Sequence, residues 1–221
     1  MRVFRLRRRV TASILGAAAA LAFALAGPDA RAAPRRYVLD AAASRIEIHV
    51  GKTGLFGFAG HEHQVVAGAF RGTAMLDPQR VAGDTLDLTV DAGALRVTGQ
   101  GEPAGDVPQV QAAMLGPACL DAARFPTIHF VSTVVGDGGA HGTTGRDLMV
   151  RGDLTLHGAT RPFTVRVSVD VAGDRLEATG QATLRQTDFG ITPISKAGVV
   201  KVKDEVVIVW RIRGAAVGPG R

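Results

Sequence analysis

His61 and His63 stand on either side of Glu62 in the segment GFAGHEHQV. If this segment is extended, the two imidazoles lie on one face and the carboxylate lies on the other. Two histidines at this spacing can supply two ligands to a metal ion, but a catalytic zinc site needs three protein ligands and an open position. A third ligand would have to come from another histidine or a carboxylate elsewhere in the chain. The plain alternative for the pair is hydrogen bonding in a loop.

Other motifs of catalysis are missing from the sequence. It contains no HExxH motif, no second dense cluster of histidine and cysteine, no GxSxG elbow and no GxxxxGK phosphate loop. The tripeptide Asp-Phe-Gly at 188–190 lacks every accompanying kinase element. We therefore expect no enzymatic activity, no catalytic residue and no cofactor. A metal-dependent enzyme or metal-binding protein centred on His61 and His63 is the alternative.

The elements that must position these residues are predicted to be β-strands. In FTVRVSVDV, at residues 163–171, apolar side chains alternate with polar ones, as in a strand with one buried face. Similar runs predict strands at residues 46–50, 65–76, 85–91, 127–135, 148–156, 176–184 and 199–212. Turn signals separate these runs, and they include residues 83–84, 136–139, 157–158 and 173–174.

One segment departs from the alternation. Residues 107–120 carry Val110, Met114 and Leu115 at helical spacing behind Pro108, which predicts one short helix that ends at Gly116-Pro117. About eight strands and one helix indicate a β-sandwich or a closed barrel, and composition does not separate the two. A barrel of about eight strands is either filled by side chains or just wide enough for one ligand. Because the chain has one Trp, one Tyr and nine Phe, small aliphatic residues facing inward leave room for a ligand.

Residues 1–32 have the pattern of a cleaved export signal. Five arginines in the first nine residues precede an apolar run at 13–26, and Ala30-Arg31-Ala32 supplies the small-x-small pattern that signal peptidases need. The apolar run is short for a membrane span, which takes about 20 residues, so cleavage is favoured over anchoring. We expect a periplasmic or secreted protein with no stable membrane anchor after cleavage, and the export route stays open.

The remaining residues, 33–221, suit a single domain. The leader carries six of the 26 Lys and Arg residues and one of the 20 Asp and Glu residues, which leaves 20 basic and 19 acidic residues. The net charge of +6 therefore arises mostly from the leader, and we expect no nucleic acid partner. Cys119 is the only cysteine, so no internal disulfide forms, and its apolar neighbours favour a small core residue.

Several ordered segments carry a resemblance to a known family. The opening YVLDAAASRIEIHV is followed by residues 113–133 (AMLGPACLDAARFPTIHFVST), 152–165 (GDLTLHGATRPFTV), and TDFGI and VKDEVVI within 187–208. In this order they resemble the YceI-like family of exported, lipocalin-like proteins, across nearly the whole mature chain. The resemblance implies an all-β, eight-stranded antiparallel lipocalin-like barrel with one short helix across an end. It also implies a pore that holds a long isoprenoid or other amphiphilic chain, and no catalysis.

We therefore predict an exported barrel that binds a long apolar or amphiphilic ligand, such as an isoprenoid, a quinone-like molecule or a fatty lipid, for sequestration or transport. Burying such a chain contributes about 0.8 kcal/mol per CH₂ group, so the pore needs few polar contacts. A structural or partner-binding barrel with a filled core stays open, as does a homodimer. The candidates for cavity contacts, each also a candidate for ordinary core, are the large apolar residues Phe56, Phe58, Phe70, Met114, Phe130, Phe163 and Trp210.

Two features depart from the family pattern. Proteins near the centre of the family carry an arginine two residues before the Asp-Phe-Gly stretch, where this chain has Gln186 and places Arg185 one step earlier. One step along a strand turns a side chain to the other face, so a head-group contact of that arginine does not carry over. The second departure is the GFAGHEHQV segment, whose role stays open.

Overall fold

The structure, a computed structural model, describes residues 33–53, 63–77, 80–100, 103, 105–142, 145–193, 195–196 and 200–218. All of them belong to one unit of the chain, Ala32–Arg221. The predicted leader at 1–32 and the candidates Phe56, Phe58 and His61 lie outside the described residues. Within the described ranges, no helix is long and apolar enough to cross a bilayer.

Strands make up most of the described chain. They are β1 (Arg35–Thr53), β2 (His63–Ala67), β3 (Phe70–Leu76), β4 (Thr85–Asp91), β5 (Leu95–Val97), β6 (Thr127–His141), β7 (Gly145–Leu156), β8 (Ala159–Ala172), β9 (Arg175–Arg185), β10 (Ser195–Lys196) and β11 (Val200–Val217). The α-helix of the described part is α1 (Val107–Leu115). The described residues also form three short 3₁₀ segments, which are η2 (Val81–Gly83), η3 (Ala92–Ala94) and η4 (Gln186–Phe189).

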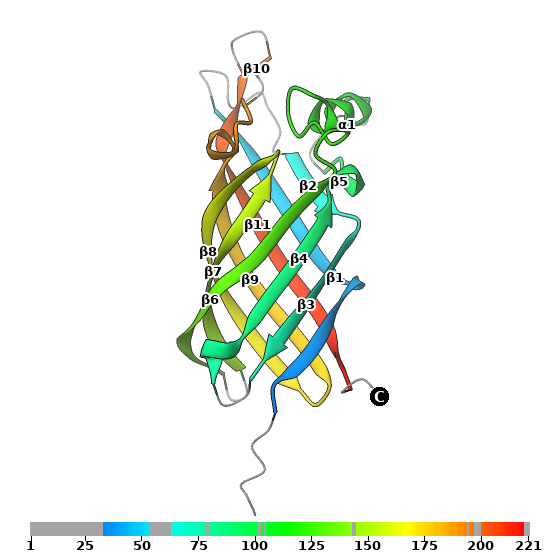
Figure 1. The fold of residues 1–221 in the computed structure, drawn as a ribbon. Helices are drawn as coiled ribbons and strands as arrows, with labels where there is room; N and C mark the ends of the chain where they lie inside the picture. The colour runs from blue at the N-terminus through cyan, green and yellow to red at the C-terminus, as the bar shows by residue number, and fades with distance from the viewer. Residues whose placement is uncertain are drawn as a thin grey trace, which may run out of the picture. The chain divides into compact units, whose positions relative to one another are not determined.

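Eight strands close into an antiparallel barrel (Figure 1). Their order around the ring is β1, β11, β9, β8, β7, β6, β4 and β3, and the pairing of β3 with β1 completes it. β2 and β3 pair with different halves of β1, and β5 pairs with β2. The pairing of β11 with β1 rules out an open sandwich, and it confirms the predicted barrel.

The alternation in β8 shows why these sequences form the barrel wall. Val165, Val167 and Val169 are buried toward the interior, while Thr164 and Arg166 between them are exposed. A strand presents successive side chains to opposite faces, so one apolar face is buried and one polar face stays in water. Closure of the ring pairs the strand edges that would otherwise bind other chains.

Two sequence-based boundaries are wrong, and one is confirmed. The predicted turn at residues 136–139 lies inside β6, which pairs with β7 through a register shift between Asp137 and Gly139. Such a bulge absorbs an extra residue without ending the strand. The predicted strand at 65–76 is broken at 68–69, between β2 and β3. The end predicted for the helix, at Gly116-Pro117, is confirmed, because α1 ends at Leu115 and Gly116 is extended before Pro117.

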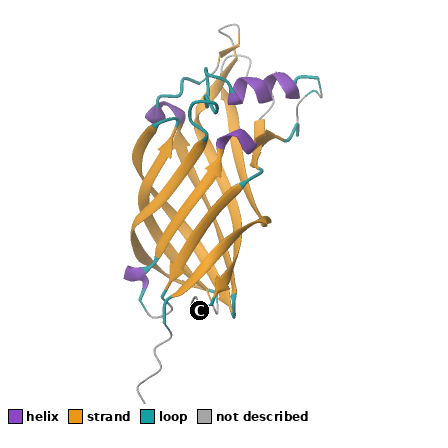
Figure 2. Ribbon diagram, turned by 45° about the vertical axis from the view of Figure 1, so that its right-hand side comes forward, coloured by secondary structure: helices purple, strands orange, loops and turns teal. Residues whose placement is uncertain are grey.

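The two ends of the barrel carry different elements (Figure 2). One end, called the helix end below, carries α1, η3, η4 and the two-residue turn at 157–158. The other, called the hairpin end, carries η2, the turn at 173–174, the start of β1 and the end of β11. At the hairpin end, Arg35 of β1 donates to the carbonyl oxygen of Gly173 at 2.9 Å and forms an ion pair with Asp174. These contacts hold β1 against the β8–β9 turn.

Candidate ligand cavity inside the barrel

A cavity of about 300 Å³ lies inside the barrel, and all eight ring strands contribute side chains to its wall. The residues that line it are aliphatic, aromatic or sulfur-containing, except for Asp84, Thr85 and Gln186. Small-molecule sites are commonly cavities of about 300–1,000 Å³ with mostly apolar walls and a few polar groups. The interior is therefore suited to an apolar molecule rather than to a charged one.

The predicted cavity residues fall into three groups. Met114, Phe130, Phe163 and Trp210 line the cavity. Phe70 does not line it, and its half-buried side chain packs against the surrounding core. Two candidates from the same prediction lie outside the described residues: Phe56 and Phe58. Cys119, expected to be a small core residue, is half-buried and also lines the cavity.

Two glycines make room for the aromatic rings. A Cβ atom at Gly180 would lie 2.5 Å from Cζ2 of Trp210, and a Cβ atom at Gly152 would lie 2.6 Å from Cζ of Phe130. Both distances are well inside van der Waals contact, so each ring occupies the space that a side chain on the neighbouring strand would fill. The sequence contains no short-range signal of this arrangement, because Gly180 and Trp210 meet only through the pairing of β9 with β11.

A buried carboxylate reaches the cavity at the hairpin end. The side chain of Asp84 is 1% exposed, and its Oδ2 accepts from Nη2 of Arg146 at 3.1 Å. Its Oδ1 accepts from the backbone N–H of Asp77 at 2.6 Å. Burial raises the pKa of Asp84, while the Asp77 amide and the charge of Arg146 oppose that rise. Sequence reasoning missed this residue, since Gly83-Asp84 has only the pattern of a turn.

Gln186 is the polar residue of the cavity wall at the helix end. It is buried at the start of η4, and its Nε2 donates to the carbonyl oxygen of Lys203 at 2.8 Å. Arg185, the last residue of β9, has an exposed side chain. The adjacent residues therefore face opposite sides of the wall, which places a neutral amide inside and the positive charge outside.

The segment after α1 covers the helix end. Met114, Cys119 and Leu120 line the cavity, and the backbone N–H of Leu120 donates to the carbonyl oxygen of Met114 at 3.0 Å. Phe125 docks this segment on the β7–β8 turn, where its ring lies edge-on to His157 with centroids 4.8 Å apart. Nδ1 of His157 lies 3.2 Å from the carbonyl oxygen of Phe189. One contact network thus joins the covering segment, the turn and η4.

The described histidines do not assemble a metal site. His49, His129 and His141 lie beside the carboxylates of Glu47, Asp87 and Asp147 respectively. His63 begins β2 and shares the face of Val65, which lines the cavity. In the part of the chain that the structure describes, no three His, Cys, Asp or Glu side chains form a group that could hold a metal ion. His61, the other member of the predicted pair, lies outside that part.

Comparison with known proteins places the barrel among relatives. The model of the YceI-like domain family matches residues 37–213. A UPF0312 protein of Pseudomonas syringae pv. tomato is 37% identical over 78 residues, which cover 33% of this chain and 38% of that protein. A UPF0312 protein of Vibrio cholerae is 29% identical over 140 residues, covering 61% and 67% of the two chains. The first of these alignments thus spans less than half of the relative's length.

Solved structures share the fold at low sequence identity. BcnA of Burkholderia cenocepacia superposes with a TM-score of 0.62 and 19% identity, over 79% of this chain and 98% of its own. A polyisoprenoid binding domain from Saccharophagus degradans, implicated in plant cell wall breakdown, superposes with a TM-score of 0.59 and 16% identity, over 82% and 98%. At such identities the likeness demonstrates a common fold.

Proposed function

Because this chain belongs to the YceI-like family, we propose that it is an exported carrier that binds a long isoprenoid or other lipid chain inside its barrel. The proposal includes removal of residues 1–32 and a location in the periplasm or the medium. It requires no catalytic step and no cofactor. The relative from Saccharophagus degradans is described as a polyisoprenoid binding domain, which supports a ligand of this class.

One observation carries the proposal, namely an apolar cavity with polar residues near its two ends. Asp84 stands at the hairpin end and Gln186 at the helix end, and the wall between them is formed by aliphatic and aromatic side chains. Each buried CH₂ group of a ligand contributes about 0.8 kcal/mol. A chain of isoprene units therefore needs no specific polar contact along its length to be held.

The direct test is mass spectrometry of the protein recovered from cells that express the whole chain. Native mass spectra should show one lipid per barrel, and solvent extraction should release a long-chain molecule whose mass identifies its class. The polypeptide mass should correspond to a chain that begins at Ala33. Repeated preparations without lipid would contradict the carrier function, and an intact leader on the protein of the export fraction would contradict the proposed processing.

A matched pair of variants on β9 separates cavity binding from surface adsorption. Ala178 lines the cavity, whereas Gln181 on the same strand is exposed. Ala178→Phe should occupy ligand space and reduce the lipid recovered per barrel, with a loss of stability of about 1–3 kcal/mol from overpacking. Gln181→Phe should retain the lipid of the parent protein. Equal lipid content in the two variants would place the lipid outside the cavity.

The same preparations test the metal alternative. Lipid-free protein that carries stoichiometric zinc, and loses it in His61→Ala/His63→Ala, would replace the carrier function with a metal-dependent one. Metal-free protein of unchanged stability would remove that alternative.

A further inference from the structure

The barrel wall has a seam between two neighbouring strands. β8 and β9 pair from Arg166 and Gln181 to the turn at the hairpin end, and no pairing is formed above that point. Continuing the same register would place Phe163 opposite Leu184. Instead, β8 stays paired with β7 up to Ala159, and β9 stays paired with β11 up to Arg185. The two strands therefore separate near the helix end while each keeps its other neighbour.

The sequence of β8 suits this separation. Pro162 lies within the unpaired stretch, and it has no backbone N–H to offer a neighbouring strand. Proline occurs within sheets mainly at edges for this reason. The sequence of β8 therefore favours the seam, which is more than fraying at the end of a strand.

A pocket of about 420 Å³ lies at the seam. Its walls come from β8, β9 and η4, and the residues are Arg161, Pro162, Phe163, Thr183, Leu184, Arg185, Asp188 and Phe189. Phe163 and Leu184 also line the cavity inside the barrel, called the main cavity below. These two side chains therefore stand between the pocket outside and the apolar interior.

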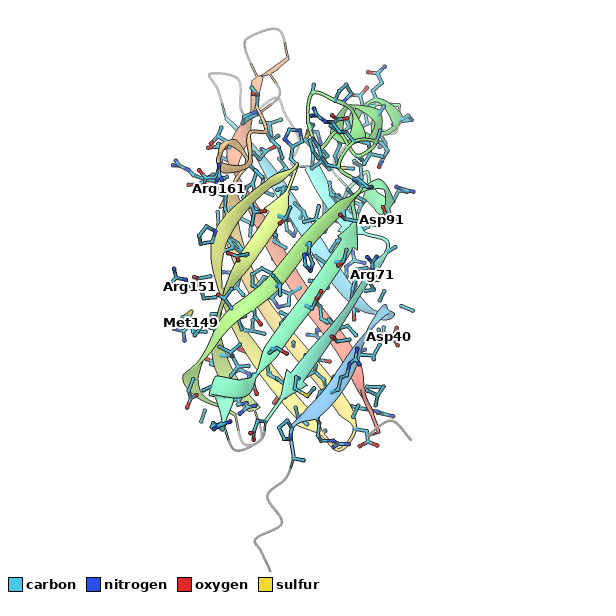
Figure 3. The ribbon with its side chains drawn as sticks, viewed as in Figure 1. Asp40, Arg71, Asp91, Met149, Arg151 and Arg161 are labelled. Carbon is cyan, nitrogen blue, oxygen red and sulfur yellow. The ribbon has the colours of Figure 1, made fainter. Side chains whose placement is uncertain are left out.

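Two arginines give the pocket its charge. Arg161 donates through Nε to the carbonyl oxygen of Asp188 at 3.1 Å and through Nη1 to that of Thr160 at 3.0 Å. Neutral carbonyl groups thus orient its guanidinium, and its positive charge remains available. Figure 3 shows Arg161 on the outside of the barrel, near the helix end.

Arg185 supplies the second positive charge. Its Nε lies 3.7 Å from Oδ2 of Asp204, and its side chain is 62% exposed, so the pair neutralises it weakly. Asp188 is the acidic residue among those that line the pocket. The lining therefore carries a net positive charge of one, from two arginines and one aspartate.

We propose that this pocket binds the anionic head group, a phosphate or a carboxylate, of a long-chain amphiphile whose chain passes between Phe163 and Leu184 into the main cavity. Guanidinium groups bind such anions through paired N–H donors. The apolar chain then enters through the wall, while the head group stays at the outer surface between Arg161 and Arg185. This inference rests on the proposed function, because it requires the main cavity to hold the chain.

The test compares two ligands that differ only in the head group. Farnesyl phosphate and farnesol are titrated into delipidated protein made from the whole chain, and binding is followed by the fluorescence of Trp210. This residue is the one tryptophan of the chain, and it lines the cavity. The variant is Arg161→Gln/Arg185→Gln. The control is Arg71→Gln, an exposed arginine on β3, four strands around the ring from β8 through β7, β6 and β4.

We expect the double variant to bind farnesyl phosphate about tenfold more weakly, with farnesol binding and melting temperature unchanged. Arg71→Gln should bind both ligands as the parent protein does. Raising the salt concentration should weaken farnesyl phosphate binding and leave farnesol binding unaffected.

Two outcomes would overturn the head-group pocket while the carrier function stands. One is that the ratio of the Kd values for farnesol and farnesyl phosphate is the same in the double variant as in the parent protein. The other is inorganic phosphate competing as strongly as farnesyl phosphate, which would make the pocket a site for free anions. Failure of the parent protein to bind either farnesyl ligand would instead contradict the proposed function itself.

Discussion

The two ends of the barrel close the cavity by different means. At the hairpin end β8 and β9 stay paired to their turn, and the buried pair of Asp84 and Arg146 lies beside the cavity. At the helix end β8 and β9 separate, and the closure comes from the segment after α1, from η4 and from the neutral amide of Gln186. This difference supports the proposed entry of a ligand chain at the helix end rather than at the hairpin end.

The largest effect on stability is expected at the hairpin end. Asp84→Ala removes the acceptor for the Asp77 amide and the partner of Arg146. We expect a loss of about 3 kcal/mol in the free energy of unfolding, because a buried donor and a partly buried charge lose their partner. Urea unfolding measures it. The control is Asp87→Ala, an exposed carboxylate beside His129, with an expected change below about 1 kcal/mol. Equal losses in both variants would show that the buried carboxylate at the hairpin end contributes no more to stability than an exposed one.

A smaller loss of stability, joined to a change in kinetics, is expected at the helix end. Phe125→Ala removes the ring that packs against His157 and lies over Gly158. Because Phe125 is half-buried, we expect a loss of about 2 kcal/mol, less than for a fully buried ring. Release of bound lipid should become faster, since the covering segment loses its anchor.

Stopped-flow transfer of a fluorescent lipid to vesicles measures this release rate. Val134→Ala, at an exposed position of β6, is the control and should leave both quantities unchanged. An unchanged release rate in Phe125→Ala would show that the segment after α1 does not limit access.

The smallest effects are opposite responses to pH at the two ends. Burial raises the pKa of Asp84 above 3.8, so the part of its contribution to stability that depends on ionisation is complete below that pH and is lost as the pH rises through the folded-state pKa. The hydrogen bonds from Thr187 lower the pKa of Asp204 below 3.8. Its contribution is present above 3.8 and is lost as the pH falls through its folded-state pKa.

Unfolding free energies between pH 7 and pH 2 measure these two responses. Asp84→Asn and Asp204→Asn each remove one titrating group, so their differences from the parent protein should change with pH in opposite directions. Changes in the same direction would show that the environments of the two carboxylates shift their pKa values in the same direction.

Sequence analysis correctly predicted those elements of the barrel that depend on local periodicity. Alternation in β8 predicted that Val165, Val167 and Val169 face inward, although Val171 near the end of the strand is exposed. The spacing of Val110, Met114 and Leu115 located α1. Local pattern failed at residues 136–139, where glycines typical of a turn lie in a strand that continues through a bulge. The partner strand β7 decides that outcome, and a window of a few residues does not contain it.

Sequence analysis predicted an apolar cavity, but it did not predict the residues at the two ends of that cavity. Phe130, Phe163 and Trp210 line the cavity because any inward position of a barrel strand faces the same interior, and Met114 reaches it from α1. Phe70 shows the limit of this reasoning, since it packs in the core without reaching the cavity. The roles of Gly180, Asp84 and the seam at Pro162 each depend on strands far apart in the sequence.

The sequence by itself determined which segments form strands with one apolar face, where the helix lies, the family resemblance and the apolar character of the interior. Each of these follows from the order of side chains along one segment. Only the tertiary structure decided that β11 closes on β1, that Asp84 meets Arg146, and that β8 parts from β9. The physical reason is register. Each of these outcomes depends on which residues of two distant strands lie side by side, and the hydrogen bonds and packing of the whole ring select that alignment together.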